Sequence, residues 1–172
     1  MRVIIGCEES QAVCKAFRAK GHEAYSCDLK PCSGGHPEWH IIQDVLEVIK
    51  GGAFKTEAGT LVTISWDLGI YHPPCTYLSS SGLHWNNKIE GREEKTQEAL
   101  MFIRALMESP FPYAIENPIG AASRIRKPDQ IIQPWQFGHP ESKATCLWLK
   151  GLPKLAPTNI LTPDKFRPNG KP

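Results

Sequence analysis

Short apolar runs that end at a glycine or an acidic residue alternate with helical patterns along the sequence. This alternation limits the folds that the chain can adopt. The first run, Val3-Ile4-Ile5, is β-branched and ends at Gly6, which is typical of a buried parallel strand. Residues 10–20 follow with an apolar stripe at helical spacing, which Ser10 can cap and Gly21 can end. The N-terminal region therefore predicts a strand followed by a helix.

The same order continues through the chain. Strands alternating with helices predict an α/β fold with a mostly parallel sheet, in a single domain of residues 1–160. The remainder, residues 161–172, is rich in Pro and Lys and is expected to be an irregular tail. Further strands are expected at residues 23–27, 39–42, 68–71 and 112–115, and helices at residues 45–49 and 93–107.

Composition narrows the class of protein. The 172 residues carry a net charge of +2, which neither requires nor excludes a nucleic-acid partner. No apolar run approaches the roughly 18 residues that a membrane span needs, so no membrane partner is expected. The six cysteines form no CxxC pair, and no export signal is present. We therefore expect reduced thiols in a cytoplasm.

Acidic residues follow three of the expected strands, at Asp28, Asp44 and Glu116. Ligands of doubly wound sheets bind beyond the carboxyl ends of the strands, where an acid can accept hydrogen bonds from a ribose or an adenine amine. The first strand leads through Gly6-Cys7-Glu8 into a helix N-terminus with free N–H groups. This loop, Asp28 and Asp44 together predict a cofactor site, although the loop lacks a GxGxxG pattern.

A cysteine follows one expected strand in the sequence His72-Pro73-Pro74-Cys75. The two prolines stiffen the chain and lack N–H donors, so the Cys75 thiol is held in a fixed loop at the ligand edge of the sheet. A nucleophilic cysteine requires solvent access and a lowered pKa. The alternative for any single cysteine is a small buried thiol.

The next expected strand ends at Ile115-Glu116-Asn117-Pro118. An apolar strand here delivers a carboxylate beside a rigid proline turn. A Glu that is partly desolvated in such a crevice has a raised pKa and can share a proton with a ring nitrogen. The alternative is a Glu that caps the end of the strand.

The Pro-Cys loop and the Glu-Asn-Pro turn resemble the two central signatures of cytosine-C5 DNA methyltransferases. Across residues 1–160 the chain is similar to small phage and prophage proteins of this type. The resemblance implies a Rossmann-like fold that binds S-adenosylmethionine, in a bacterial or phage-infected cell. It implies catalytic residues Cys75, Glu116 and Asn117, with Asp28 on the ribose and Asp44 at the adenine. Cofactor contacts are also expected from Gly6, Cys7, Glu8 and Pro73.

The chain departs from this family in its target recognition. The resemblance implies cytosine-containing DNA as the substrate, but the family's long recognition block and its C-terminal Gly-Asn-Ser motif are absent. Either specificity is low, or a homodimer or partner subunit supplies it, or the substrate is small enough to need none. Arg124 and Arg126, or alternatively Lys143, are candidates for holding the base. Residues 79–88 are expected to form a loop that closes on substrate, with contacts from Ser79 and with Trp85 stacking on a base.

Three other interpretations stay open from sequence alone. The double proline is also found in methyltransferases that act on cytosine N4 or adenine N6. The altered glycine loop fits a non-catalytic module that binds S-adenosylmethionine or a partner. A zinc site is the third possibility, with loosely spaced ligands Cys27, Cys32, His36 and His40.

Overall fold

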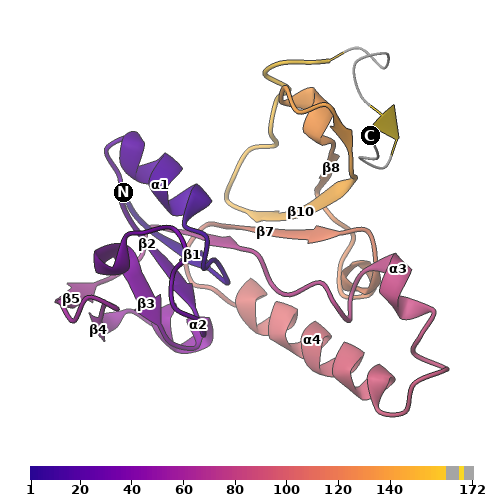
Figure 1. Ribbon diagram of the computed structural model, residues 1–172, viewed down its shortest axis with the longest axis horizontal. Coiled ribbons are helices and arrows are strands. Elements are labelled where there is room, and N and C mark those ends of the chain that lie inside the picture. Colours follow the sequence, from indigo (N-terminus) through magenta and orange to yellow (C-terminus); the bar gives the residue numbers. More distant parts are fainter. Residues whose placement is uncertain (162–166, 169–172) are drawn as a thin grey trace. The chain divides into compact units, whose positions relative to one another are not determined.

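Seven strands form a mostly parallel sheet in the computed structural model (Figure 1), which describes residues 1–161 and 167–168. The strand order is β3-β2-β1-β6-β7-β10-β8, with parallel pairing from β3 through β7 and antiparallel pairing of β10 with β8. This confirms the α/β class, and it is compatible with a Rossmann-like fold. The strands are β1 Arg2–Gly6, β2 Glu23–Asp28, β3 His40–Ile42, β6 Leu68–Tyr71, β7 Tyr113–Pro118, β8 Gln130–Ile132 and β10 Thr145–Lys150.

The chain divides into two compact units. Unit 1 contains residues 1–73 and 102–115, and unit 2 contains residues 74–101 and 116–172. The division falls inside helix α4 (Arg92–Met107) and inside strand β7, so both elements contribute to each unit. The predicted domain of residues 1–160 contains all of unit 1 and all of unit 2 except its last twelve residues.

The core of unit 1 is built on β1, whose three central residues Val3, Ile4 and Ile5 are fully buried between β2 and β6. Helix α1 (Ala12–Ala19) contacts β1 and β2. A short turn, η1 (Pro37–Trp39), precedes β3, and helix α2 (Val45–Val48) follows it. The sequence prediction missed an antiparallel hairpin of β4 (Gly52–Lys55) and β5 (Leu61–Ile64).

Unit 2 starts with the short helix α3 (Ser80–Leu83), where the sequence predicted a loop. Two 3₁₀ turns follow, η2 (Ala121–Arg124) and η3 (Pro134–Gln136). The fully buried Trp148 on β10 donates its indole N–H to the carbonyl oxygen of Arg126, which fixes the chain before β8. Most of the predicted tail lies outside the described residues; within it, β11 (Arg167–Pro168) pairs with β9 (Glu141–Ser142).

Two local expectations were wrong. Ser10 does not cap α1, since Gln11 occupies the N-cap position in a left-handed conformation without a side-chain cap. Glu116-Asn117-Pro118 is not a turn, since all three residues belong to β7. The strand extends because its pleat alternates buried and less buried residues as far as Pro118.

Candidate active site

The carboxyl end of β1 is the switch point of the sheet, because β2 lies on one side of β1 and β6 on the other. Ligands of open parallel sheets bind beyond the strands at this point. Gly6, the last residue of β1, packs so closely that a Cβ would lie 2.5 Å from Val45 Cγ2 and 2.9 Å from Tyr71 Cδ1. Glycine is therefore required by packing at the start of the predicted cofactor loop.

Three of the predicted cofactor residues meet at this end of unit 1. Burial and, to a smaller extent, the negative charges of Asp28 and Asp44 together raise the pKa of the Cys7 thiol to about 12. Cys7 also has a φ of 60°, a left-handed conformation that is rare outside glycine. The loop after β1 is therefore a tight turn that brings a protonated thiol near two carboxylates.

The two carboxylates each hold a local turn. Asp28 accepts a hydrogen bond through Oδ1 from the N–H of Lys30, at 3.1 Å. Asp44 is the N-cap of α2 and accepts through Oδ1 from the N–H of Leu46, at 2.9 Å. Asp44 is thus a helix cap, and this does not conflict with a ligand role, since the two bonds use one oxygen of each carboxylate.

Glu8 has a structural role that the sequence did not indicate. It is buried, and its two carboxylate oxygens accept hydrogen bonds from the N–H groups of Val13 (2.6 Å) and Cys14 (3.2 Å). A negative charge at a helix N-terminus is stabilising, so Glu8 supplies the cap that α1 lacks at Gln11. Its predicted contact with the cofactor stays a prediction.

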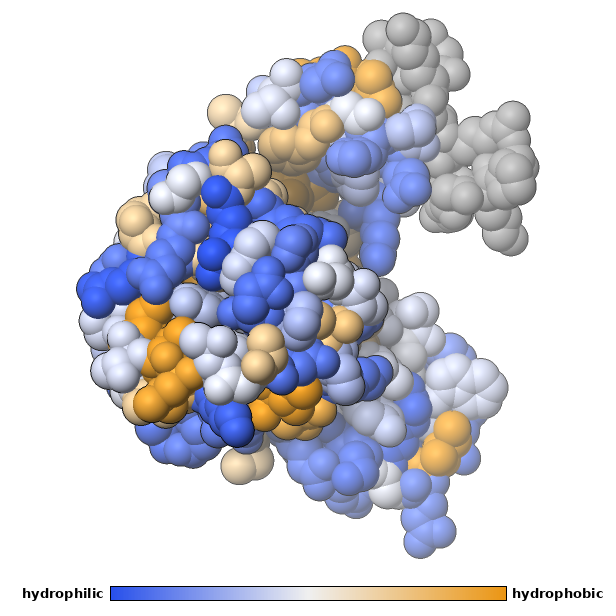
Figure 2. Space-filling model, turned by 60° about the vertical axis from the view of Figure 1, so that its left-hand side comes forward, coloured by the Kyte–Doolittle hydropathy of each residue, from blue (hydrophilic) through white to orange (hydrophobic). Residues whose placement is uncertain are grey.

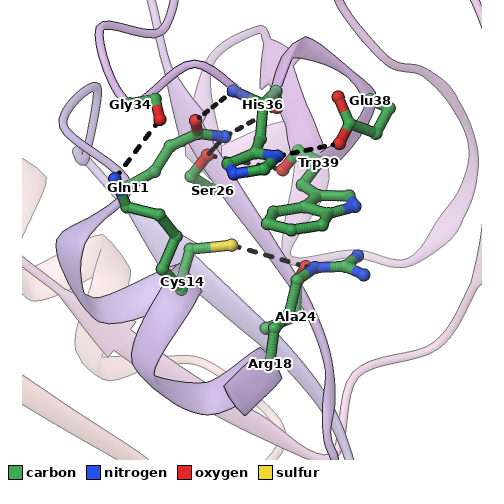
Figure 3. A network of polar contacts seen from close by, with 10 residues as sticks. Gln11, Cys14, Arg18, Ala24, Ser26, Gly34, His36, Glu38 and Trp39 are labelled. Atoms are coloured by element: carbon green, nitrogen blue, oxygen red, sulfur yellow. Dashed lines mark hydrogen bonds and ion pairs between the residues drawn. The ribbon is translucent and has the colours of Figure 1, made fainter.

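A polar network fixes the connection between β2 and β3 (Figure 3). The buried Gln11 side chain donates to Ser26 Oγ at 3.2 Å and to the carbonyl oxygen of His36 at 2.8 Å, and it accepts from the His36 N–H at 3.0 Å. The His36 ring stacks on the Trp39 ring with centroids 3.8 Å apart, and the Arg18 guanidinium lies 4.3 Å from the centre of the Trp39 ring. The connection that follows Asp28 is therefore held by side chains on α1 and β2.

The same contacts argue against the zinc alternative. The buried His40 ring contacts Ser26 Oγ through Nδ1 and the carbonyl oxygen of Lys30 through Nε2, each at 2.8 Å. The buried Cys27 thiol donates to the carbonyl oxygen of Gln43. Among residues 1–161 and 167–168, no group of three His, Cys, Asp or Glu side chains can hold a metal ion.

In unit 2, Cys75 is exposed and begins a turn. Its carbonyl oxygen accepts hydrogen bonds from the N–H groups of Leu78 (3.0 Å) and Ser79 (2.9 Å). Ser79 then occupies the N-cap position of α3, with its Oγ 3.3 Å from Ser81 Oγ. The backbone around Cys75 is thus ordered by its own turn, and the thiol faces solvent.

Glu116 and Asn117 lie on opposite faces of β7, because successive strand residues point to opposite sides. Asn117 shares the buried face of Tyr113 and Ile115, and Glu116 is half-buried on the other face. The sequence did not indicate Cys146 on β10, a buried thiol whose pKa is raised by burial and then by the charge of Glu116. The Glu116 carboxylate therefore lies close enough to Cys146 for its charge to raise the pKa of that buried thiol.

The three basic candidates differ in their surroundings. The Arg126 guanidinium already makes two hydrogen bonds, to Asp129 Oδ1 at 2.9 Å and to the carbonyl oxygen of Leu149 at 3.4 Å. Arg124 is exposed and lies 3.9 Å from Glu93 Oε1, and Lys143 is exposed after β9. These surroundings leave Arg124 and Lys143 as the more accessible cations.

A fourth cation, Arg92, was missed by the sequence analysis. Its guanidinium donates to the carbonyl oxygen of Thr76 at 3.1 Å and lies 5.0 Å from the centre of the Tyr77 ring. Arg92 therefore contacts the two residues that follow Cys75. The only sequence signal for it was its place at the start of the long helix α4.

Comparisons with known proteins add no family to this picture: no protein-family model matches the chain, and no curated protein matches it. The described part of the chain also contains no helix that is both long enough and apolar enough to cross a membrane.

Proposed function

We propose that the protein transfers a methyl group from S-adenosylmethionine to C5 of cytosine in DNA, with Cys75 as the nucleophile. The observation that carries this proposal is the position of Cys75. It is the one exposed thiol among the six cysteines, and it follows β6, the strand beside the switch point of the sheet. The Pro-Cys and Glu-Asn-Pro motifs supply the resemblance to cytosine-C5 methyltransferases.

The residues at the carboxyl ends of β1, β2 and β3 fit the methyl donor. Asp28 and Asp44 present carboxylates, which accept hydrogen bonds from ribose hydroxyls and from an adenine amine. The charges of both acids raise the pKa of the Cys7 thiol, so the three residues lie near one another at this end of the sheet. S-adenosylmethionine, when bound, supplies an electrophilic methyl group.

Cys75 and Glu116 would carry the chemistry on the base. The Cys75 thiolate forms a bond to C6 of cytosine, which moves electron density to C5, while Glu116 gives a proton to N3 and neutralises the developing charge. S-adenosylmethionine would supply the methyl group that C5 takes up, its sulfur–methyl bond being the bond that breaks. Loss of the C5 proton to a base would then expel the Cys75 thiolate and restore the aromatic ring, and the N3 proton would return to Glu116.

A trapping experiment tests this proposal. Full-length protein is incubated with S-adenosylmethionine and DNA that contains 5-fluorocytosine, where fluorine blocks the final proton loss. We expect a covalent protein–DNA complex with the wild type and none with Cys75→Ser. The matched control is Cys32→Ser, because Cys32 is a partly exposed thiol on a loop, and this variant should still form the complex.

Other outcomes separate the rival functions. Full methylation by Cys75→Ser would show that C5 chemistry is wrong and would favour transfer to an amino group. Binding of S-adenosylmethionine without methylation or trapping would favour a non-catalytic module. If Cys32→Ser abolishes the covalent complex and Cys75→Ser does not, the nucleophile is Cys32 and the assignment to Cys75 is wrong.

A further inference from the structure

Two cation–aromatic pairs lie along residues 76–92, which we refer to as the 76–92 segment. The Lys88 ammonium is 5.1 Å from the centre of the Trp85 ring, and the Arg92 guanidinium is 5.0 Å from the centre of the Tyr77 ring. The His84 ring contacts Trp85 with centroids 4.7 Å apart. Trp85 is nevertheless 44% exposed, so much of a large aromatic side chain meets solvent.

This exposure is not the result of a loosely held loop. The buried Thr96 on α4 donates through Oγ1 to the carbonyl oxygen of Tyr77 at 3.0 Å and accepts from the Asn86 side chain at 2.9 Å. Asn86 also donates to Glu93 Oε2 at 2.6 Å. Because Tyr77 and Asn86, which lie on either side of Trp85 in the sequence, are both attached to the first turns of α4, the Trp85 ring is presented on a defined backbone.

The charge of the chain is unevenly divided. Unit 2 contains twelve lysines and arginines against eight aspartates and glutamates, whereas unit 1 contains eight against ten. The basic excess therefore belongs to the unit that carries Cys75 and the 76–92 segment. Lys88 and Arg124 are exposed cations in this unit, and Arg92 is partly exposed. Cations paired with aromatic rings along one segment, as Lys88 is with Trp85 and Arg92 with Tyr77, suit a polyanion with stacking bases.

We propose that the 76–92 segment binds single-stranded nucleic acid, with an unpaired base on Trp85 and the phosphates near Lys88 and Arg92. A single strand is preferred over a duplex because duplex bases stack on each other, and their faces are not available to an aromatic side chain. This inference rests on the proposed function for its biological role, since it specifies the form in which cytosine is presented. Its binding step itself needs no methyl transfer.

A protein partner is the competing occupant of an exposed tryptophan. Figure 2, which turns the left-hand side of Figure 1 forward, shows a mainly hydrophilic face with hydrophobic residues in separate groups. Within the 76–92 segment, the exposed large apolar residues are Trp85 and Ile89, next to the cation Lys88. This mixture of charge and aromatic surface favours the nucleic acid.

The test is a binding titration with a fluorescent oligothymidylate of about 20 nucleotides, compared with the same strand paired to oligoadenylate. These ligands contain no cytosine, so the result does not depend on catalysis. We expect the single strand to bind at least about 10-fold more tightly than the duplex. Trp85→Ala should weaken single-strand binding about 5- to 100-fold, the range measured for one stacked base, and Trp85→Phe should recover most of it.

Two further variants complete the design. Lys88→Ala should reduce the dependence of log affinity on log salt by about 0.7, which corresponds to one lost phosphate contact on a single strand. Ile131→Ala removes an exposed apolar side chain elsewhere in unit 2 and should leave binding unchanged. Equal or tighter duplex binding, or wild-type affinity in Trp85→Ala, would overturn the inference.

A change of oligomeric state in Trp85→Ala with unchanged oligonucleotide affinity would also overturn it, in favour of a protein interface. The two proposals fail separately. Loss of trapping on 5-fluorocytosine DNA with retained oligothymidylate binding removes the methyltransferase proposal alone. If Trp85→Ala traps 5-fluorocytosine DNA as well as the wild type does and binds oligothymidylate with unchanged affinity, only the single-strand inference is wrong.

Discussion

Ser79 and Gly120 form an antiparallel β-bridge, which joins the segment that follows Cys75 to the segment that follows Glu116. On either side of the bridge, the Ala121 N–H donates to the carbonyl oxygen of Leu78 at 2.7 Å, and the Ser80 N–H donates to that of Ile119 at 3.0 Å. The two motifs of the proposed site are thus linked through the backbone of unit 2. Local order after one motif depends on local order after the other.

Gly120→Ala should disrupt this link. A Cβ at position 120 would overlap the backbone carbonyl oxygen of Leu78 and would lie 3.0 Å from Ser79 Cα. Because these atoms are backbone, they cannot move aside as a flexible side chain would, and we expect a loss of about 1–3 kcal/mol in the free energy of unfolding. Urea denaturation measures it, with Ser123→Ala as the exposed control. Equal stability of the two variants would show that the bridge is dispensable.

Cys75 should react with a maleimide faster than any other cysteine of the native protein. It is exposed, whereas burial raises the pKa of Cys14 to about 11 and those of Cys7 and Cys27 to about 12. A raised thiol pKa leaves less thiolate near neutral pH, so those three should react only as the pH approaches these values. Peptide mass spectrometry after brief labelling at about pH 7.5 identifies the site. First labelling of Cys7 or Cys27 would contradict the burial of the β1 and β2 ends.

The sheet could be predicted because its central strands are simple in sequence. Val3-Ile4-Ile5 is fully buried, and a run of three β-branched, apolar residues before a glycine is typical of a buried strand. The β4–β5 hairpin was missed because its strands are largely exposed, so their sequence lacks a clear alternation. Burial leaves a signal in the sequence, and exposure leaves little.

The positions of the motifs of the candidate site could be predicted from the sequence, but the contacts of their side chains with other residues could not. The acids at the ends of β2 and β3 were located from position alone, because a strand end is a local property. The contacts of Glu8 with α1, of Cys146 with Glu116 and of Arg92 with Thr76 depend on tertiary packing. No spacing in the sequence encodes them.

Thr96→Val should loosen the 76–92 segment without removing any of its residues. The substitution keeps the shape of the buried side chain but removes the hydroxyl that bonds the Tyr77 carbonyl oxygen and the Asn86 amide. Leaving these groups unpaired should cost about 1–3 kcal/mol. Amide hydrogen exchange should accelerate between residues 76 and 92. Glu94→Gln, an exposed change two residues earlier on α4, is the control. Unchanged exchange in Thr96→Val would show that the segment is held by other contacts.

Glu8→Ala should destabilise the start of α1. The substitution removes the buried carboxylate that accepts from Val13 and Cys14, and the loss should be about 1–3 kcal/mol because both N–H groups are left without this acceptor. Exchange of these two amide protons should accelerate together. Glu9→Ala is the matched control, since its side chain is less buried and the Glu9 carbonyl oxygen, which accepts from Ser33, is retained.

The same position separates a structural role from a role in cofactor binding. Glu8→Gln retains one carbonyl oxygen as an acceptor for the helix but removes the negative charge. If Glu8 serves α1, Glu8→Gln should lose less stability than Glu8→Ala and should bind S-adenosylmethionine with unchanged affinity in calorimetry. A variant of wild-type stability that loses cofactor affinity more than about 10-fold would instead assign the Glu8 carboxylate to the ligand.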